Sequence, residues 1–363
     1  MSNRNSSAQI GRRMKRLLRK LRRERCQAAL ITAVADVTYL SGFSGEDSWL
    51  VVFADGEAFL VTDGRYTEQA RDEAPGCHIV ERAEPLAVAA GQVLRRRRPA
   101  RVAFDPDHLT VRAYRALLDE IGKSELVAVQ SLVAEIRQVK DSGEVRLLRR
   151  ALQIAQNAFI AVSHEVRPGM KEKDVADLLE TLVRKHGGQR TAFETIVAAG
   201  ERSALPHARA GDRAIRAGEV VLVDWGAWYN HYYSDLTRLI MPDTIPKVLR
   251  EIYEIVLEAQ AAALRRIAPG AEASSIDAAG RQVIERAGYG EHFGHGIGHG
   301  VGLEVHELPH VNPVSHVKLK PGMVFTVEPA IYLPGRGGVR IEDVVRVTRT
   351  GHEVMSDLEK RLV

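Results

Sequence analysis

The sequence has few of the features that would place a protein in a specialised class. Its 363 residues include only two cysteines, Cys26 and Cys77, without metal-ligand spacing, so we expect free thiols in a reducing cytoplasm rather than disulfides. No apolar run reaches the roughly 18 residues of a membrane span, and the apolar core of a signal peptide is missing. With 45% apolar and 27% charged residues, the chain is expected to be globular, with two domains.

Charge of one sign is also scarce. A net charge of +4, dispersed over this length, does not indicate a nucleic-acid or membrane partner. Residues 1–25 are an exception, with ten Arg or Lys and one acidic residue, as in a transit peptide or a nucleic-acid arm. Their apolar residues have helical spacing, which favours an amphipathic helix with arginines facing water and a core face of Met14, Leu17, Leu18 and Leu21. The basic run at residues 95–98 is expected to be a solvated loop.

Two domains are predicted from the order of the elements. From Ala28 to about Val133, short apolar runs alternate with helical patterns, which indicates an α/β domain around a mixed sheet. A long helix is predicted from Gly143, with Asp141 and Ser142 as candidate caps, and its start marks the domain boundary. We therefore predict domains at residues 1–136 and 137–363.

The second domain repeats itself. Residues 166–188 parallel residues 267–290 at an offset of 101, and IRAGEVVLVDWGAWY parallels LKPGMVFTVEPAIYL at an offset of 104. In the latter pair Asp224 aligns with Glu328, and at an offset of 107 Asp235 aligns with Glu342. Three matches in order, with acids opposite acids, predict two duplicated αβ halves about a pseudo-twofold axis.

Each repeat sets carboxylates among β-forming residues. The segment VVLVDWGAWYNHYYSDLTRLIM reads as two strands joined by a turn at residues 229–231. Four buried acids would repel one another unless a cation lay between them, and carboxylates with one imidazole suit Mn²⁺, Co²⁺, Zn²⁺ or Fe²⁺. The alternative is that each acid pairs with an arginine, for which the candidates are Arg238, Arg340 and Arg346.

The nitrogen ligand is sought in GHGIGHGVGLEVHELP, where His295, His299 and His306 are spaced by four and seven residues. This spacing would align them on a zinc-binding helix, but five glycines argue against a helix, because each costs roughly 1 kcal/mol relative to alanine. An extended or looping backbone is expected, close to a ligand or another strand. His299 is the natural nitrogen ligand.

At these residues the sequence resembles the pita-bread metallopeptidases, among them the Xaa-Pro aminopeptidases and Xaa-Pro dipeptidases (prolidases). ADVTYLSGFSG and LVTDGRYTEQA resemble their creatinase-like N-terminal domain, and IRQVKDSGEV the entry to their catalytic domain. The resemblance implies an α/β (α+β) fold, a creatinase-like domain followed by a pita-bread domain. It implies two divalent metal ions, bridged by Asp235 and Glu342, with the ligand set Asp224, Asp235, His299, Glu328 and Glu342.

The same resemblance suggests roles for further residues. His207 resembles the histidine on the proline side of the substrate, His295 the one beside the metals, and His306 the one at the scissile peptide. Arg340 resembles an arginine that orients a bridging carboxylate, and Glu328 is also expected to act as general acid and base. Tyr232 and Tyr332 are either proline-pocket or core residues, and ordinary hydrogen-bonded roles are expected for His231, His292, His310 and His316.

The function expected from these residues is that of an Xaa-Pro aminopeptidase. It would remove an N-terminal residue before proline using a metal-bridging hydroxide, with manganese as the first choice of ion. The alternative is an Xaa-Pro dipeptidase, but His310 stands where many such enzymes resemble one another in having a carboxylate-binding arginine. A creatinase-like hydrolase and an inactive peptide-binding module are less favoured, because all five ligands are present. A cytoplasmic homodimer is expected.

Overall fold

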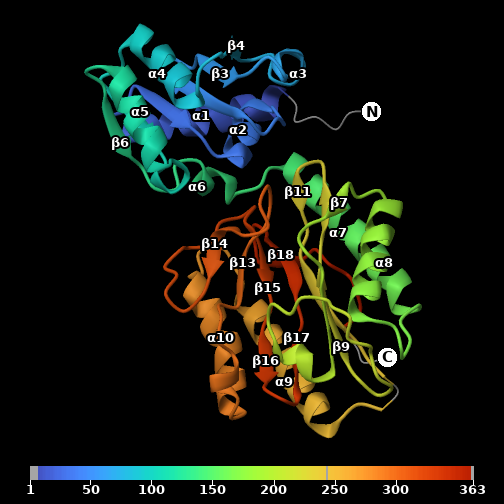
Figure 1. The fold of residues 1–363 in the computed structure, drawn as a ribbon. Helices are drawn as coiled ribbons and strands as arrows, with labels where there is room; N and C mark the ends of the chain where they lie inside the picture. Colours follow the sequence, from blue (N-terminus) through green and yellow to red (C-terminus); the bar gives the residue numbers. More distant parts are fainter. Residues whose placement is uncertain (1–6, 243, 361–363) are drawn as a thin grey trace. The chain divides into compact units, whose positions relative to one another are not determined.

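The computed structural model describes residues 7–242 and 244–360 and divides into two compact units, residues 1–137 and 138–363 (Figure 1). Within the described ranges, no helix has both the length and the apolarity that crossing a membrane requires.

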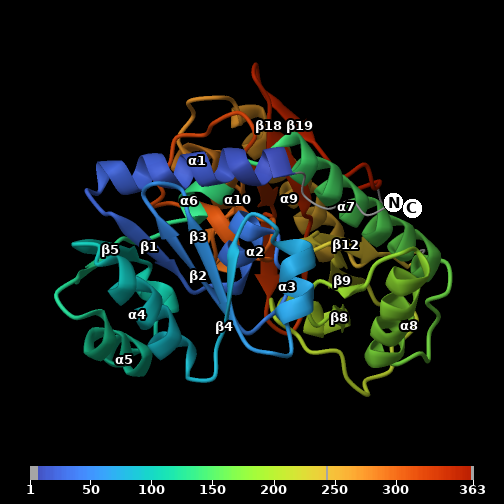
Figure 2. The ribbon, with the colours of Figure 1, turned by 90° about the horizontal axis from the view of Figure 1, so that it is seen from above.

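Unit 1 is built on one mixed sheet with helices on both faces. Its six strands follow the order β4-β3-β2-β1-β5-β6, and β2 is antiparallel to both neighbours whereas the other pairs are parallel. The strands are β1 Ala28–Ile31, β2 Ser48–Phe53, β3 Ala58–Thr62, β4 His78–Glu81, β5 Arg101–Phe104 and β6 Glu125–Ala128. The helices are α1 Ser7–Arg23, α2 Val34–Ser41, α3 Thr67–Glu73, α4 Leu86–Arg97, α5 Val111–Ile121 and α6 Ala134–Arg137. Helices α4 and α5 lie on one face of the sheet and α1 on the other (Figure 2).

Two basic segments of this unit differ from expectation. Helix α1 forms as predicted, but not all of its cations face water: Arg13 is buried, donates to the Tyr39 carbonyl at 3.1 Å and stacks on the Tyr39 ring. Lys20 is also buried and donates to Glu135 at 2.7 Å. Long apolar stems allow such burial when the charged end finds a partner. Arg95–Arg97, predicted as a loop, form the last turn of α4, where cations are favourable at the carbonyl end of the helix.

Unit 2 contains four long helices and several small sheets. The helices are α7 Ser142–Ser163, α8 Glu172–Lys185, α9 Lys247–Arg266 and α10 Ala273–Arg286. Sheet orders are β11-β10-β7, β12-β9-β8, β14-β13-β15-β18-β19 and β16-β17. The strands of the first half are β7 Arg190–Thr191, β8 Ile196–Ala199, β9 Val221–Trp225, β10 Ala227–Tyr229, β11 Tyr232–Tyr233 and β12 Leu236–Ile240. Those of the second half are β13 Gly298–Gly300, β14 Glu307–Val311, β15 Val324–Val327, β16 Ala330–Leu333, β17 Gly337–Arg340, β18 Asp343–Val347 and β19 His352–Val354.

The duplication predicted from the sequence is visible element by element. Helices α8 and α10 have equal lengths and lie 101 residues apart in the chain. A long helix precedes each of them, α7 before α8 and α9 before α10. A two-stranded antiparallel ladder follows each, β9 with β12 in the first half and β15 with β18 in the second. The backbone amide of Glu342 donates to the Thr237 carbonyl at 3.2 Å, so the two ladders meet where their acidic residues lie. Apolar faces of α9 and α10 cover the second ladder and form the main core of the unit.

The predicted hairpin of the first half is present, with one addition. The turn lies at Asn230 and His231, both with positive φ, as the two-residue turns of hairpins require. Each long strand is broken in two near Gly226, where a Cβ would lie 1.9 Å from the carbonyl oxygen of Ser234. This close approach bends the hairpin and separates its tip, β10 and β11, from the ladder that carries the acids.

Candidate metal centre

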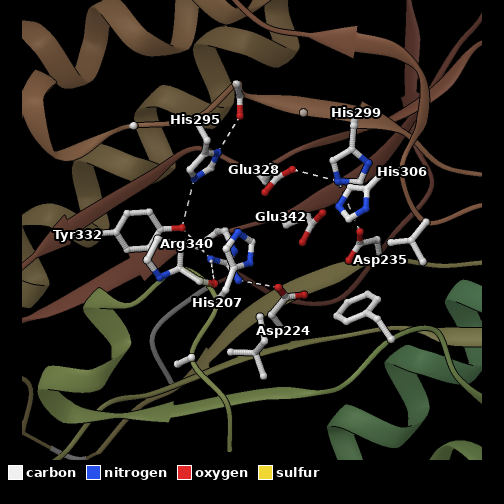
Figure 3. A pocket seen from close by; sticks show the side chains of 18 of the residues that line it. His207, Asp224, Asp235, His295, His299, His306, Glu328, Tyr332, Arg340 and Glu342 are labelled. Atoms are coloured by element: carbon white, nitrogen blue, oxygen red, sulfur yellow. Dashed lines mark hydrogen bonds and ion pairs between the residues drawn. The ribbon is translucent and has the colours of Figure 1, made fainter. Parts of the chain in front are cut away.

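Four acidic residues reach one cavity from equivalent positions of the two halves (Figure 3). Asp224 lies on β9 and Glu328 directly follows β15, whereas Asp235 directly precedes β12 and Glu342 directly precedes β18. Asp235 and Glu342 are only 4% and 2% exposed. Each acid has at least one apolar neighbour in the chain, so the fold that buries the apolar residues also carries the carboxylates into its interior.

Strand β13 passes close to its neighbours because it consists of glycines on either side of His299. A Cβ on Gly298 would lie 1.9 Å from the carbonyl oxygen of Thr326, and one on Gly300 would lie 2.1 Å from that of Leu308. No other residue type fits this spacing. The expectation of an extended, closely approached backbone is therefore confirmed.

His299 points from this strand towards the acids (Figure 3). Its Nε2 lies 3.3 Å from Glu328 Oε1 and 3.6 Å from Asp235 Oδ2. Nδ1 lies 3.1 Å from the Gly300 carbonyl, so Nδ1 carries a proton and Nε2 is left towards the carboxylates. Burial lowers the pKa of His299, but the hydrogen bond and charge of Glu328 raise it overall, so the protonated ring donates from Nε2 to Glu328. The neutral ring would instead present the Nε2 lone pair to a cation.

Burial and the neighbouring carboxylates disfavour the ionised form of several of these acids, and their pKa values reflect this. Burial, together with the neighbouring carboxylates, raises the pKa of Asp235 and of Glu342 well above the usual range. Burial also raises the pKa of Asp224, against the opposing effect of Arg340. Burial is the largest single effect on Glu328 and acts in the same direction, but the hydrogen bond and charge of His299, together with the charges of His295 and Arg340, outweigh it and hold the pKa of Glu328 at about 2.

The arrangement of these acids suits the binding of divalent cations. One ligand atom each from Asp235, His299 and Glu342 lie within 4.8 Å of one another. Asp224 Oδ1 is buried and has no hydrogen-bond partner among the described residues, although Oδ2 accepts from Arg340. A buried carboxylate oxygen without a donor is costly, and hard oxygen ligands with one imidazole are the set that suits Mn²⁺, Co²⁺ or Zn²⁺.

Arg340 is the cation that holds this arrangement from behind. It is 4% exposed and donates from NH2 to Asp224 Oδ2 at 2.6 Å and from Nε to the Thr237 hydroxyl at 3.0 Å. Thr237 in turn donates to Glu342 Oε2 at 2.8 Å, so Arg340 contacts one acid directly and a second through a hydroxyl. A third bond, from NH1, reaches the Tyr332 hydroxyl at 2.7 Å.

Only part of the arginine-pairing alternative is present. Arg340 pairs with Asp224, whereas Arg238 pairs with Asp343 and Arg346 pairs with Glu353. Of these three candidate arginines, only Arg340 forms an ion pair with one of the four acids in the described part of the chain.

Three of the predicted histidines line the same cavity, whose volume is about 830 Å³. His295 Nδ1 lies 2.8 Å from the Gly296 carbonyl and Nε2 lies 3.2 Å from the Tyr332 hydroxyl, so both ring nitrogens are engaged. His306 is exposed and its ring centre lies 4.3 Å from that of His299. Burial lowers the pKa of both His295 and His306, which favours the neutral imidazole. His207 reaches the cavity from the loop that follows residues 200–204.

All nine residues predicted for the site therefore surround one cavity, although sequence reasoning missed others. Tyr332 lines the cavity, whereas Tyr232 is 1% exposed and donates to Glu144 inside the fold. His310, expected to be an ordinary loop residue, lies on β14 and lines the cavity. Thr237 and Thr326, which bond Glu342 and Glu328, are single hydroxyl residues in apolar strands, a signal that could have identified them. Phe193 and Ile196, which form apolar wall, lie in a segment without a distinguishing pattern.

Two family models match the chain, one for each unit. The Creatinase/Prolidase N-terminal domain matches residues 13–139, and Metallopeptidase family M24 matches residues 146–349. The chain belongs to metallopeptidase family M24. Its acids and His299 therefore lie in the catalytic part of a metal-dependent peptidase with the pita-bread fold, and the family implies divalent metal ions at this cluster.

Relatives within family M24 cover most of the chain. An uncharacterized peptidase of Bacillus subtilis is 39% identical over 92% of this chain and 94% of its own length. An Xaa-Pro dipeptidase of Pyrococcus furiosus is 41% identical over 66% of this chain and 69% of its own length.

Solved structures of M24 peptidases have the same fold. An Xaa-Pro dipeptidase from Bacillus anthracis superposes with a TM-score of 0.94 at 38% identity, covering 98% of this chain and 99% of its own. An X-Pro aminopeptidase from Thermotoga maritima gives 0.89 at 35% identity, with 96% and 98% coverage. These similarities establish the fold and the general chemistry, while relatives carry names of both specificities.

Proposed function

We propose that this M24 peptidase is a dinuclear-metal exopeptidase that cleaves the peptide bond before a proline at the second position of its substrate. The observation that carries the proposal is the convergence of four carboxylates and His299, from both halves, on a cavity that also holds His207, His295 and His306. Asp224, Asp235, His299, Glu328 and Glu342 would hold the ions. Two bound divalent ions supply a lowered pKa of bound water and polarisation of the substrate carbonyl.

Glu328 is assigned to proton transfer. Its Oε1 is engaged by the Thr326 hydroxyl at 3.2 Å and by His299, which fixes the carboxylate and leaves Oε2 for exchange with the substrate side. In this role Glu328 accepts the proton of the attacking water and passes it to the leaving nitrogen. The proline nitrogen of an Xaa-Pro bond has no hydrogen, so that transferred proton is needed for its release as an amine.

The histidines are assigned to the substrate. Neutral His306 donates to the oxygen on which negative charge develops, since it is exposed to the cavity and lies against the His299 ring. His207 faces the proline side from the opposite loop. Arg340 keeps Asp224 and, through Thr237, Glu342 in place, because its bonds to both are made from the buried side of the cavity.

Of the two specificities, we propose the Xaa-Pro dipeptidase as the first candidate. The sequence favoured the aminopeptidase, but relatives at 41% and structures at 38% identity are named dipeptidases, and His310 and the guanidinium of Arg209 line the cavity where a free carboxylate could be received. The aminopeptidase remains the second candidate, because no arginine follows the VHELP segment and a cavity of about 830 Å³ has room for more than a dipeptide.

Substrate length decides between these candidates. The purified chain, tested with Mn²⁺, Co²⁺, Zn²⁺ and Fe²⁺ in turn, should release alanine from Ala-Pro much faster than from Ala-Pro-Ala if it is a dipeptidase. Faster cleavage of the tripeptide would establish the aminopeptidase. Cleavage of Ala-Ala-Ala at the same rate as Ala-Pro-Ala would contradict proline selectivity, and binding of these peptides without any cleavage would indicate a peptide-binding module.

A further inference from the structure

Helix α10 carries an acid–arginine pair that lies outside the cavity lining yet contacts the segment bearing His295. Asp277 is fully buried, and Arg281 one turn later donates to it from Nε and NH2, both at 2.9 Å. A guanidinium bound in this bidentate way is fixed in plane and direction. Arg281 is therefore held rigidly by its own helix before it touches anything else.

The other side of the Arg281 guanidinium holds the main chain of the histidine loop. NH1 donates to the Phe293 carbonyl at 3.0 Å and NH2 donates to the His295 carbonyl at 2.7 Å. The guanidinium also lies 4.3 Å from the centre of the Phe293 ring. One side chain thus binds two backbone carbonyls and one aromatic face within three consecutive residues.

The ends of this loop are held by other contacts, since Phe293 donates to the Gly290 carbonyl at 3.3 Å and the Ile297 carbonyl accepts from the Glu328 amide at 2.8 Å, so the bonds from Arg281 add the hold on its middle, at His295. Residues 293–297 lie between the short helical turn Gly290–His292 and the start of β13 at Gly298, and they belong to neither. A Cβ on Gly294 would meet nothing within 4 Å, so side-chain packing does not confine the residue between the two held carbonyls. Gly294 and Gly296, one on each side of His295, allow the backbone a wider range of conformations than other residues would.

The His295 ring is oriented by the same assembly. The Phe293 ring, fixed by Arg281, meets the His295 ring edge-on at 5.0 Å and 79°. The ring then bonds the Gly296 carbonyl and the Tyr332 hydroxyl, which Arg340 holds. If the His295 carbonyl were released, the ring would have to be aimed by those two bonds alone.

We infer that Arg281, fixed by Asp277, is a positioning residue that sets the backbone and ring orientation of His295. The inference rests on the proposed function only for its effect on catalysis, since the clamp itself is a matter of conformation. Helix α10, which does not line the cavity, thereby determines how the cavity residue His295 is oriented. Displacements of about 1 Å in such groups are enough to lower rates by about 10²-fold.

Three variants separate the clamp from fold stability. Arg281→Met alone would remove the guanidinium but leave the buried carboxylate of Asp277 without that partner. The double variant Asp277→Asn/Arg281→Met removes both charges, so no uncompensated charge stays buried at this position. Arg281→Lys retains the charge without the planar fork. Arg286→Met is the matched control, because Arg286 is exposed on the last turn of the same helix and, within the described part of the chain, its side chain hydrogen-bonds only to Gln282, at 3.5 Å.

The readouts are histidine ring NMR signals of the ¹⁵N-labelled full chain, assigned with His295→Asn, and the kinetics of Ala-Pro cleavage. We expect the His295 ring signals to shift or broaden in the double variant and in Arg281→Lys while the His299 signals stay in place. In both variants kcat should fall by about 10- to 100-fold with KM changed by less than about threefold. Arg286→Met should match the unsubstituted chain in both readouts.

Unchanged His295 signals in the double variant would overturn the inference, as would full retention of kcat. A shift of all histidine signals together with a general loss of stability would overturn it too, because it would show a merely structural role. If the unsubstituted chain cleaves neither Ala-Pro nor Ala-Pro-Ala, the proposed function fails, and the NMR comparison still decides on the clamp.

Discussion

At the scale of single residues, three of the four acids of the centre are each held by different contacts. Asp224 is bound by Arg340, Glu342 by the Thr237 hydroxyl, and Glu328 by Thr326 and His299. These contacts orient individual oxygens without neutralising the group as a whole. The residues that matter for chemistry can therefore be separated from those that hold them by conservative substitutions.

Glu328→Gln tests the proton-transfer role. The amide keeps the size of the side chain but cannot accept and return a proton, so kcat on Ala-Pro should fall by about 10²- to 10⁴-fold. Metal content, measured by mass spectrometry on the same samples, identifies any loss of binding. Exposed Glu291→Gln serves as the control, and turnover close to normal in Glu328→Gln with metals bound would sink the assignment.

Arg340→Lys tests the support of the acids. An ammonium group cannot reproduce bonds to Asp224, Thr237 and Tyr332 from one planar fork, so metal affinity or kcat/KM should drop by about 10- to 100-fold. Calorimetric titration with Mn²⁺ measures the affinity. Arg336→Lys, at an exposed position of the same β16–β17 hairpin, should leave the titration unchanged; equal behaviour of the two variants would contradict the role of Arg340.

At the scale of elements, the centre depends on strands that approach unusually closely. Strand β13 fits beside β15 and β14 only because Gly298 and Gly300 have no side chain. A buried ion pair lies at the beginning of the neighbouring strand β14, where Lys140 lies 2.7 Å from Glu307, the residue after His306. Both features can be tested through stability.

Gly298→Ala should be severely destabilising because its Cβ would lie 1.9 Å from the Thr326 carbonyl oxygen. Relieving this overlap must displace backbone, so we expect a loss of about 3 kcal/mol or more in the free energy of unfolding. Gly294→Ala is the matched control, since its Cβ would meet nothing within 4 Å. Urea unfolding compares the two, and equal midpoints would refute the close approach.

Lys140→Met should lower the free energy of unfolding by about 3–5 kcal/mol, because it removes the ammonium group that lies 2.7 Å from Glu307, a carboxylate with only 3% side-chain exposure. Lys140→Met/Glu307→Gln should recover part of this loss, since the charge is removed as well. Thermal and urea unfolding of both variants provide the check. A double variant less stable than the single one would mean that the carboxylate, not the pair, is needed.

Much of the second unit could be predicted because its signals are repeated. The offsets of 101, 104 and 107 locate α8 with α10, β9 with β15 and β12 with β18, and acids that recur in apolar strands stand out twice. Elements without such contrast were missed. Strand β4 is a four-residue edge strand with exposed ends, and α4 is composed largely of small residues before its arginines. Phe193 and Arg281 reach the site through tertiary contacts that no local pattern encodes.

At the scale of the whole molecule, the buried carboxylates of unit 2 repel one another, and bound metal ions would reduce this repulsion. Asp235 and Glu342 are buried beside other carboxylates, and the pKa of each is raised. An ion that binds only the folded state stabilises it by RT ln(1 + [L]/Kd), about 2.7 kcal/mol at 100 times Kd. The domain limits 1–136 and 137–363, the homodimer and the cytoplasmic location stay predictions.

Removal of metal should therefore lower the melting temperature, and added Mn²⁺ should restore it. Asp235→Asn removes one buried negative charge, so the metal-free variant should melt at or above the temperature of the metal-free original chain while gaining little from Mn²⁺. Differential scanning calorimetry with and without a chelator measures all four states. A full Mn²⁺-induced increase in Asp235→Asn would contradict the assignment of Asp235 as a ligand.

The most direct test of the account is to titrate the metal-free chain with Mn²⁺ while following the rate of alanine release from Ala-Pro. We predict no release without the ion and a rate that rises to a plateau at two ions per chain. Release at full rate in the metal-free chain, or none from either Ala-Pro or Ala-Pro-Ala at any ion content with Mn²⁺, Co²⁺, Zn²⁺ or Fe²⁺, would contradict a dinuclear Xaa-Pro peptidase.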